Sequence, residues 1–131
     1  MFQFINNVRA FIDRGKRGWA NTDVWDGDTY LGKVISGMVR ELAKYNSGCP
    51  EELYDKTCKN DECHKWKEIL EEIAQGFEAA DQMKRMSFSH MWEKKEDIYD
   101  SMYKKIKQKQ LAKKYDRGME LFSKYFLNLW D

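Results

Sequence analysis

The sequence predicts an all-α fold, a compact bundle of four to five helices with a long C-terminal helical segment. A single proline and eight scattered glycines among 131 residues leave the helical periodicity almost uninterrupted. No stretch alternates apolar and polar residues as a half-buried strand would. A chain of this length can bury a core without disulfides, so residues 1–131 are predicted to form a single helical domain.

The first predicted helix begins at the N-terminus and is amphipathic. Its apolar residues recur at helical spacing around one face. They are Met1, Phe4, Ile5, Val8, Phe11 and Ile12. Glycine favours the left-handed conformation that ends helices, so Gly15 and Gly18 are expected to end this one.

A second helix is predicted to run to about Tyr45, after capping side chains at residues 21–23. Pro50 forbids an easy continuation beyond it. The apolar side chains expected to be buried are Leu31, Val34, Ile35, Met38, Leu42 and Tyr45. Glycine inside a helix costs about 1 kcal/mol against alanine, so the small residues here predict close approach of another backbone. These are Gly32, Ser36 and Gly37.

Residues 49–62 are predicted to form a loop, and a third helix to begin near Asp61. Its apolar stripe consists of Trp66, Ile69, Leu70, Ile73, Phe77 and Ala80. On a helical wheel Glu71 and Glu78 lie opposite this stripe, so they are expected to face solvent. The segment 83–92 is either a turn or an irregular link.

The chain from Trp92 onward has the pattern of one long helix, but its apolar stripe changes face. The first stripe contains Ile98, Met102 and Ile106, and the second contains Leu111, Tyr115, Met119, Phe122 and Phe126. Either the helix breaks near residues 107–110, or one helix packs different partners on its two halves. The apolar end of the chain must dock, and Trp130 is expected to anchor it in the core, with a partner interface as the alternative.

Several segments together resemble a family of small, functionally uncharacterised proteins encoded by tailed bacteriophages. The matching residues are Asp23-Val24-Trp25-Asp26-x-Asp28-x-Tyr30-Leu31-x-x-Val34-Ile35, Arg40-x-Leu42-Ala43, Gly48-x-Pro50, Trp66-x-x-Ile69-Leu70-x-x-Ile73-Ala74-x-Gly76-Phe77-Glu78 and Leu121-Phe122-x-x-Tyr125-Phe126-x-x-Leu129-Trp130-Asp131. The resemblance implies a viral origin, an all-helical fold and a place in the cytoplasm of a host bacterium. It implies no activity and transfers no catalytic residue.

Four potential zinc ligands lie within sixteen residues: Cys49, Cys58, Cys63 and His64. Zinc favours closure by three cysteines and one histidine, but this set lacks the paired Cys-x-x-Cys spacing of established sites. The preferred interpretation is three reduced cysteines and a surface histidine, with no cofactor. An odd number of cysteines also fits a reducing compartment better than a disulfide framework.

Two further sets of side chains are candidates for binding. Trp19, Trp25 and Tyr30 could line a small-molecule site, for example for a nucleotide, although aromatics so spaced are more often core residues. The lysines of one stretch could bind nucleic acid or an acidic partner through counterion release. They are Lys104, Lys105, Lys107, Lys109, Lys113 and Lys114. The stretch contains no arginine, and a solvated lysine face is the simpler interpretation.

Composition and motifs favour a protein that acts by binding. The net charge is only +1, with −4 over residues 1–83 and +6 over residues 84–117. Neither histidine lies in a recognisable catalytic motif and no glycine-rich phosphate loop is present, so an enzyme is not expected. We expect a non-enzymatic phage accessory protein that binds a host or phage protein, with an anti-defence role as one form of this. The alternatives are small-molecule binding and nucleic-acid binding. A homo-oligomer is expected, and a membrane partner is not, because no run of apolar residues could span a bilayer.

Overall fold

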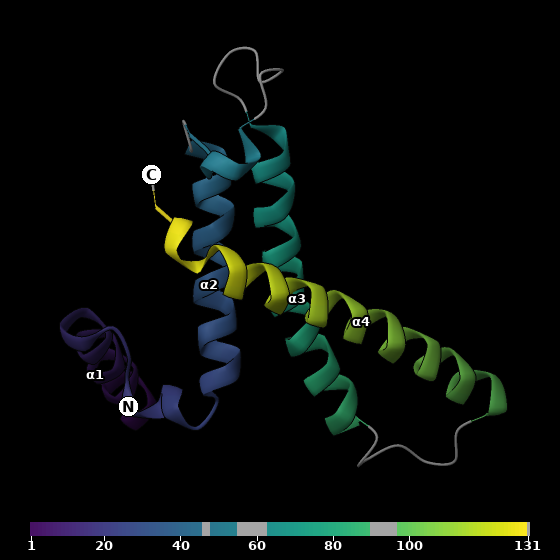
Figure 1. The fold of residues 1–131 in the computed structure, drawn as a ribbon. Coiled ribbons are helices and arrows are strands. Elements are labelled where there is room, and N and C mark those ends of the chain that lie inside the picture. The colour runs from purple at the N-terminus through teal and green to yellow at the C-terminus, as the bar shows by residue number, and fades with distance from the viewer. Residues whose placement is uncertain (46–47, 55–62, 90–96, 131) are drawn as a thin grey trace. The chain divides into compact units, whose positions relative to one another are not determined.

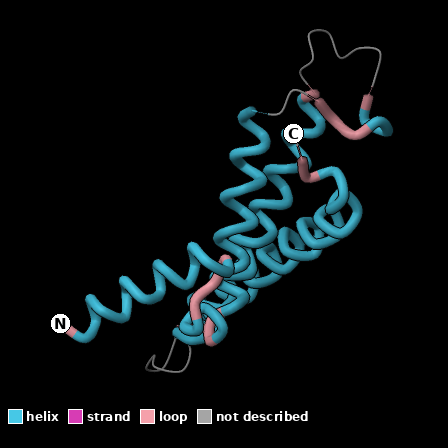
Figure 2. The backbone as a smooth tube through the Cα atoms, turned by 90° about the vertical axis from the view of Figure 1, so that its left-hand side faces the viewer, coloured by secondary structure: helices cyan, strands magenta, loops and turns pink. Residues whose placement is uncertain are grey.

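The computed structural model describes residues 1–45, 48–54, 63–89 and 97–130. Within these ranges it contains four α-helices and no strand (Figure 2). The helices are α1 (Phe2–Arg17), α2 (Gly27–Tyr45), α3 (His64–Ser89) and α4 (Ile98–Tyr125), with short 3-10 turns at η1 (Asn21–Val24), η2 (Glu51–Leu53) and η3 (Phe126–Asn128). The predicted all-α class and the long C-terminal helix are confirmed.

The chain forms two compact units, which are described separately. The first is Met1–Leu31 and the second is Gly32–Asp131. The single domain expected from the chain length stays a prediction. In the described ranges, no helix combines the length and the apolar character that crossing a membrane requires.

In the first unit, α1 ends at a single glycine. Gly18 has a φ of 83°, and its N–H donates to the carbonyl of Arg14 at 2.9 Å. A left-handed residue at this position satisfies a carbonyl that the last helical turn leaves open. Gly15 lies inside the helix, so the prediction that it shares in ending α1 was wrong.

The core of the second unit is built on one face of α3. Trp66, Leu70 and Ile73 are its largest fully buried side chains. Val39 of α2 and Leu121 and Tyr125 of α4 complete the same cluster. Trp66 meets Tyr125 edge to face with ring centroids 5.4 Å apart, a favoured aromatic geometry. The helix also continues through residues 83–89, so the prediction of a turn or an irregular link was wrong there, and residues 90–92 lie outside the described ranges.

A close backbone contact joins α3 to α4, which cross each other (Figure 1). Gly76 of α3 faces Gly118 of α4, and a Cβ atom built on Gly76 would lie 2.6 Å from the Cα of Gly118. Only glycine on both helices allows this separation. The sequence instead predicted close approach on α2, where Gly32 makes only ordinary contact with Phe77 and Gly37 has open space around it.

The apolar stripe predicted for α2 is not fully buried. Met38 is 67% exposed and Tyr45 is 70% exposed, while Ser36 and Val39 are the two residues that α2 buries. The prediction was wrong because the stripe is wider than the surface that α3 offers to it.

The last helix, α4, is continuous across residues 107–110, which settles the choice between one helix and two for residues 98–125. Its two halves pack differently. Leu111, Leu121 and Tyr125 are buried, whereas the first stripe of Ile98, Met102 and Ile106 is exposed.

The end of the chain docks only in part. Tyr125 is buried, but Leu127 is exposed and Trp130 is 72% exposed. The expectation that Trp130 anchors the core was therefore wrong. Tyr125 already fills the space beside Trp66, and α4 ends at Tyr125, so the chain continues through the 3-10 turn η3 to an exposed Trp130. The second unit thus keeps several large apolar side chains at its surface.

Gly76→Ala is expected to destabilise the protein by about 1–3 kcal/mol, since the added methyl group must push two backbones apart. Gly37→Ala is the matched control, because the same methyl group enters open space in a helix interior and is expected to stabilise by roughly 0.5–1 kcal/mol. Urea unfolding followed by circular dichroism measures both. A Gly76→Ala protein as stable as the parent would contradict the close crossing.

Candidate functional site

A largely apolar groove lies on the second unit between α2 and the end of α4. It has a volume of about 620 Å³. Its lining residues are Ile35, Met38, Val39, Glu41, Leu42, Tyr45, Phe122, Phe126 and Leu129. Glu41 is the one charged side chain among them, and it pairs with Lys44 at 3.1 Å. A groove of this size and composition is suited to taking apolar side chains from outside the chain.

The α2 wall of the groove has the spacing of a helix-packing seam. Its apolar residues follow one another at intervals of three and four along the helix. They are Ile35, Met38, Leu42 and Tyr45. At a rise of 1.5 Å per residue this seam is about 15 Å long. Such a row forms ridges and holes into which a second helix can place its own side chains.

The opposite wall is held by a row of aromatic rings. Phe77 of α3 meets Phe122 edge to face at 5.1 Å, and Phe122 meets Phe126 in the same way at 5.4 Å. Each such contact adds about 0.5–1.5 kcal/mol beyond the buried area. Phe126, the last ring of the row, remains 58% exposed at the groove. Phe77 of α3 therefore holds this wall at one end, and Phe126 at the other end is exposed to solvent.

A charged cluster joins α2 to α3 on the other side of the groove seam. Arg40 of α2 binds Glu71 through two hydrogen bonds, of 2.9 and 3.1 Å, and also binds Glu78. The hydrogen bonds that Arg40 donates to Glu78 and Glu71 raise the pKa of Arg40, and its bonds to Glu71 lower the pKa of that carboxyl group. The two carboxylates were predicted to face solvent, and their side chains are indeed 45% and 43% exposed, but the sequence of α3 alone could not predict that both bind Arg40. The cluster therefore ties α2 to α3 next to the buried Val39.

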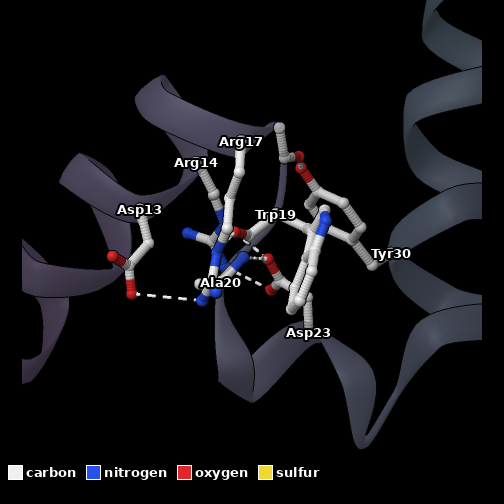
Figure 3. A network of polar contacts seen from close by, with 8 residues as sticks. Asp13, Arg14, Arg17, Trp19, Ala20, Asp23 and Tyr30 are labelled. Carbon is white, nitrogen blue, oxygen red and sulfur yellow. Dashed lines mark hydrogen bonds and ion pairs between the residues drawn. The ribbon is translucent and has the colours of Figure 1, made fainter.

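The residues predicted to bind a small molecule have three different environments in the first unit. They are Trp19, Trp25 and Tyr30. Trp19 stacks under Arg17, whose guanidinium carbon lies 4.0 Å from the ring centroid (Figure 3). The hydroxyl of Tyr30 donates to the carbonyl of Gly18 at 2.6 Å. Trp25 is 88% exposed. Trp19 and Tyr30 thus hold the turn that follows α1, and a ligand role for the three stays a prediction.

The centre of this turn is an ion pair between Arg14 and Asp23. Both oxygens of Asp23 accept hydrogen bonds from Arg14, and one also accepts the backbone N–H of Ala20 at 2.8 Å (Figure 3). Asp23 was predicted to cap the second helix, but it accepts the N–H of Ala20 at the start of η1 instead, and α2 begins only at Gly27. The hydrogen bonds from Arg14 lower the pKa of Asp23 to about 2.

The four potential zinc ligands are only partly described. Cys58 lies outside the described residues. Cys63 is buried in the core cluster, and its thiol points to the carbonyl of Leu53 at 3.9 Å, while Cys49 packs against the same cluster. In the described ranges no group of three or more His, Cys, Asp or Glu side chains is placed to hold a metal ion. The zinc interpretation stays untested.

The lysine stretch lies on α4. Lys105, Lys107 and Lys109 are exposed, on the half of the helix that also exposes Tyr99 and Tyr103. Lys113 and Lys114 instead line a small cleft with Glu72, Gln75 and Arg117, so one acidic side chain of α3, Glu72, lies near them. The stretch is therefore two surfaces, and binding of nucleic acid or of an acidic partner by either stays a prediction.

No family model, curated protein or solved structure matches this chain. The function proposed for this chain is therefore argued from its sequence and from the geometry of the groove.

Sequence reasoning identified most of the groove residues but assigned them to the core. The width of the α2 stripe could have distinguished groove residues from core residues, because the stripe contains more large apolar residues than a neighbouring helix can cover. The role of Arg40 had no local signal, since its partners lie 31 and 38 residues further along the chain.

Arg14→Gln is expected to raise the pKa of Asp23 from about 2 toward the ordinary value near 3.9, because it removes the hydrogen bonds that hold the carboxylate charged. A lowered pKa stabilises the fold above about pH 4, and this contribution is lost as the pH falls toward 2. Carbon-13 NMR titration of the carboxyl group measures the shift. Arg9→Gln, which removes the same charge elsewhere on α1, is the control. A midpoint near 4 in the parent protein would contradict the ion pair.

Proposed function

We propose that this chain is a non-enzymatic binding protein whose apolar groove receives the apolar face of an amphipathic helix from a partner protein. The observation that carries the proposal is the groove itself, about 620 Å³ in volume with a single charged lining residue. Exposed apolar surface of this kind on a folded protein marks an interaction site more often than an accident of folding.

A helix is the favoured occupant because of the three-and-four spacing along α2. The seam from Ile35 to Tyr45 matches the face that a partner helix presents at positions i, i+3, i+4 and i+7. An extended strand would need an unpaired sheet edge to bind, and the described residues contain no strand.

The surroundings of the groove support a protein partner rather than a small molecule. Leu127 and Trp130 follow the groove residue Phe126 and are also exposed, so the apolar surface continues past the groove along the end of the chain. Large exposed aromatic side chains are enriched at the centres of protein interfaces. The resemblance to tailed-phage proteins makes a protein of the host bacterium the first partner to seek, and an anti-defence role is one consequence of such binding.

Met38→Glu is expected to weaken partner binding at least tenfold, because it places a charge where an apolar side chain worth about 1.5–3 kcal/mol is covered. Met38 is exposed, so the fold should be unchanged. The partner is first found by replacing Met38 with the photoreactive residue p-benzoylphenylalanine and cross-linking in bacterial cells. Mass spectrometry then maps the attached segment, and a synthetic peptide of that segment is titrated by calorimetry.

Lys33→Glu is the matched control, since it introduces the same side chain on α2 outside the groove. We expect its affinity to stay within twofold of the parent and the mapped segment to show apolar residues at helical spacing. A segment without that spacing, or equal binding by the Met38→Glu protein, would refute the proposal.

A further inference from the structure

The N-terminal helix α1 leaves a complete apolar face uncovered. None of its residues is buried, and Phe4 and Phe11 are 72% and 77% exposed. Ile5, Val8 and Ile12 lie on the same face and are also exposed. A helix of this length is marginal in water by itself and is normally stabilised by covering such a face. Within the first unit no residue covers this face, so its cover comes from outside that unit.

The exposed face of α1 has the same spacing as the groove wall on α2. Met1, Phe4, Val8 and Phe11 recur at intervals of three and four, as the α2 seam residues do. The α1 stripe from Met1 to Phe11 is about 15 Å long at 1.5 Å per residue, which equals the length of the seam. One chain therefore carries both halves of a helix-in-groove contact.

Buried area favours the same pairing, and the charges of α1 do not oppose it. Two of its four basic residues are already paired, Arg14 with Asp23 and Arg17 with Asp13. The one charged residue lining the groove, Glu41, is itself paired with Lys44. Large aromatic side chains bury about 150–250 Å² each, so Phe4 and Phe11 of two α1 helices bury roughly 600–1,000 Å². The groove surface that they cover brings the total to on the order of 1,600 Å², the size of a standard stable interface.

We propose that α1 of a second copy of this chain occupies the apolar groove, and that two copies exchange their N-terminal helices in this way. The exchange is reciprocal, so it closes after two chains as a two-fold dimer. This inference rests on the proposed function of the groove. It adds a form of regulation, because a dimer has both grooves filled and a partner helix must displace α1 to bind.

Sedimentation equilibrium between about 5 and 200 µM on the full-length chain tests the exchange, because interfaces of this size have dissociation constants from micromolar to picomolar and are populated over this range. We expect the parent to reach the dimer mass, and Phe11→Asp and Met38→Glu each to remain at the monomer mass of 15.7 kDa. Asn6→Asp, on the polar face of α1, and Lys33→Glu are the controls and should dimerise as the parent does.

Mixing the two monomeric variants gives the sharpest test. The Phe11→Asp protein retains an intact groove and the Met38→Glu protein retains an intact α1, so an equimolar mixture should form a one-to-one complex through one restored contact. A mixture that stays monomeric overturns the inference. So does a Met38→Glu protein that dimerises alone, since that result shows pairing between two α1 helices. A monomeric parent, with α1 covered by its own chain or by a different partner, also overturns it.

Failure here is distinguishable from failure of the proposed function. The Phe11→Asp protein has a free groove, and its affinity for the mapped partner peptide is measured separately. If that peptide binds and the parent is monomeric, the groove function stands and the exchange does not. If the exchange is correct, the peptide binds Phe11→Asp more tightly than it binds the dimeric parent.

Discussion

The contact on which the second unit depends is the close crossing of α3 and α4 at Gly76 and Gly118. Two helices with side chains at this point would be held apart, and the residues on either side of the crossing could not meet. With glycine on both, Trp66 reaches Tyr125 on one side of the core and Phe77 reaches Phe122 on the same pair of helices. The angle of the crossing also carries the end of α4 beside α2, where Phe122 and Phe126 become one wall of the groove.

The groove follows from this crossing together with the charged cluster at Arg40. The crossing places the aromatic wall, and the bonds from Arg40 to Glu71 and Glu78 tie α2 to α3. The result is a surface whose apolar side chains are held by a rigid base but have no cover of their own. A protein that needed these residues only for stability would bury them, and this is the ground on which we propose a partner. The exposed face of α1 is the matching feature elsewhere in the same chain.

Helix positions were largely predictable because they depend on local signals. Gly18 ends α1, the predicted end of α2 near Tyr45 is correct, and the core stripe from Trp66 to Ile73 is buried as expected. Local signals could not predict which apolar helix face packs against which other surface. The stripe on α2 and the tail at Trp130 were assigned to the core, since periodicity identifies an apolar face without saying whether the chain contains its cover. In the sequence, Gly76 stood out only as part of the motif that resembles the phage family. Its role at the crossing could not be predicted, because it depends on Gly118 of the facing helix.

We infer that the core of the second unit lies at the α3–α4 crossing, and that the apolar faces of α1 and of the groove stay exposed until a helix of another molecule binds them. Amide hydrogen exchange, read by mass spectrometry at low and high protein concentration, tests this claim most directly. We expect residues 66–79 and 111–125 to be protected at both concentrations, and α1 and residues 35–45 to gain protection only at the higher one. Protection of α1 at low concentration equal to that of α3 would contradict the account.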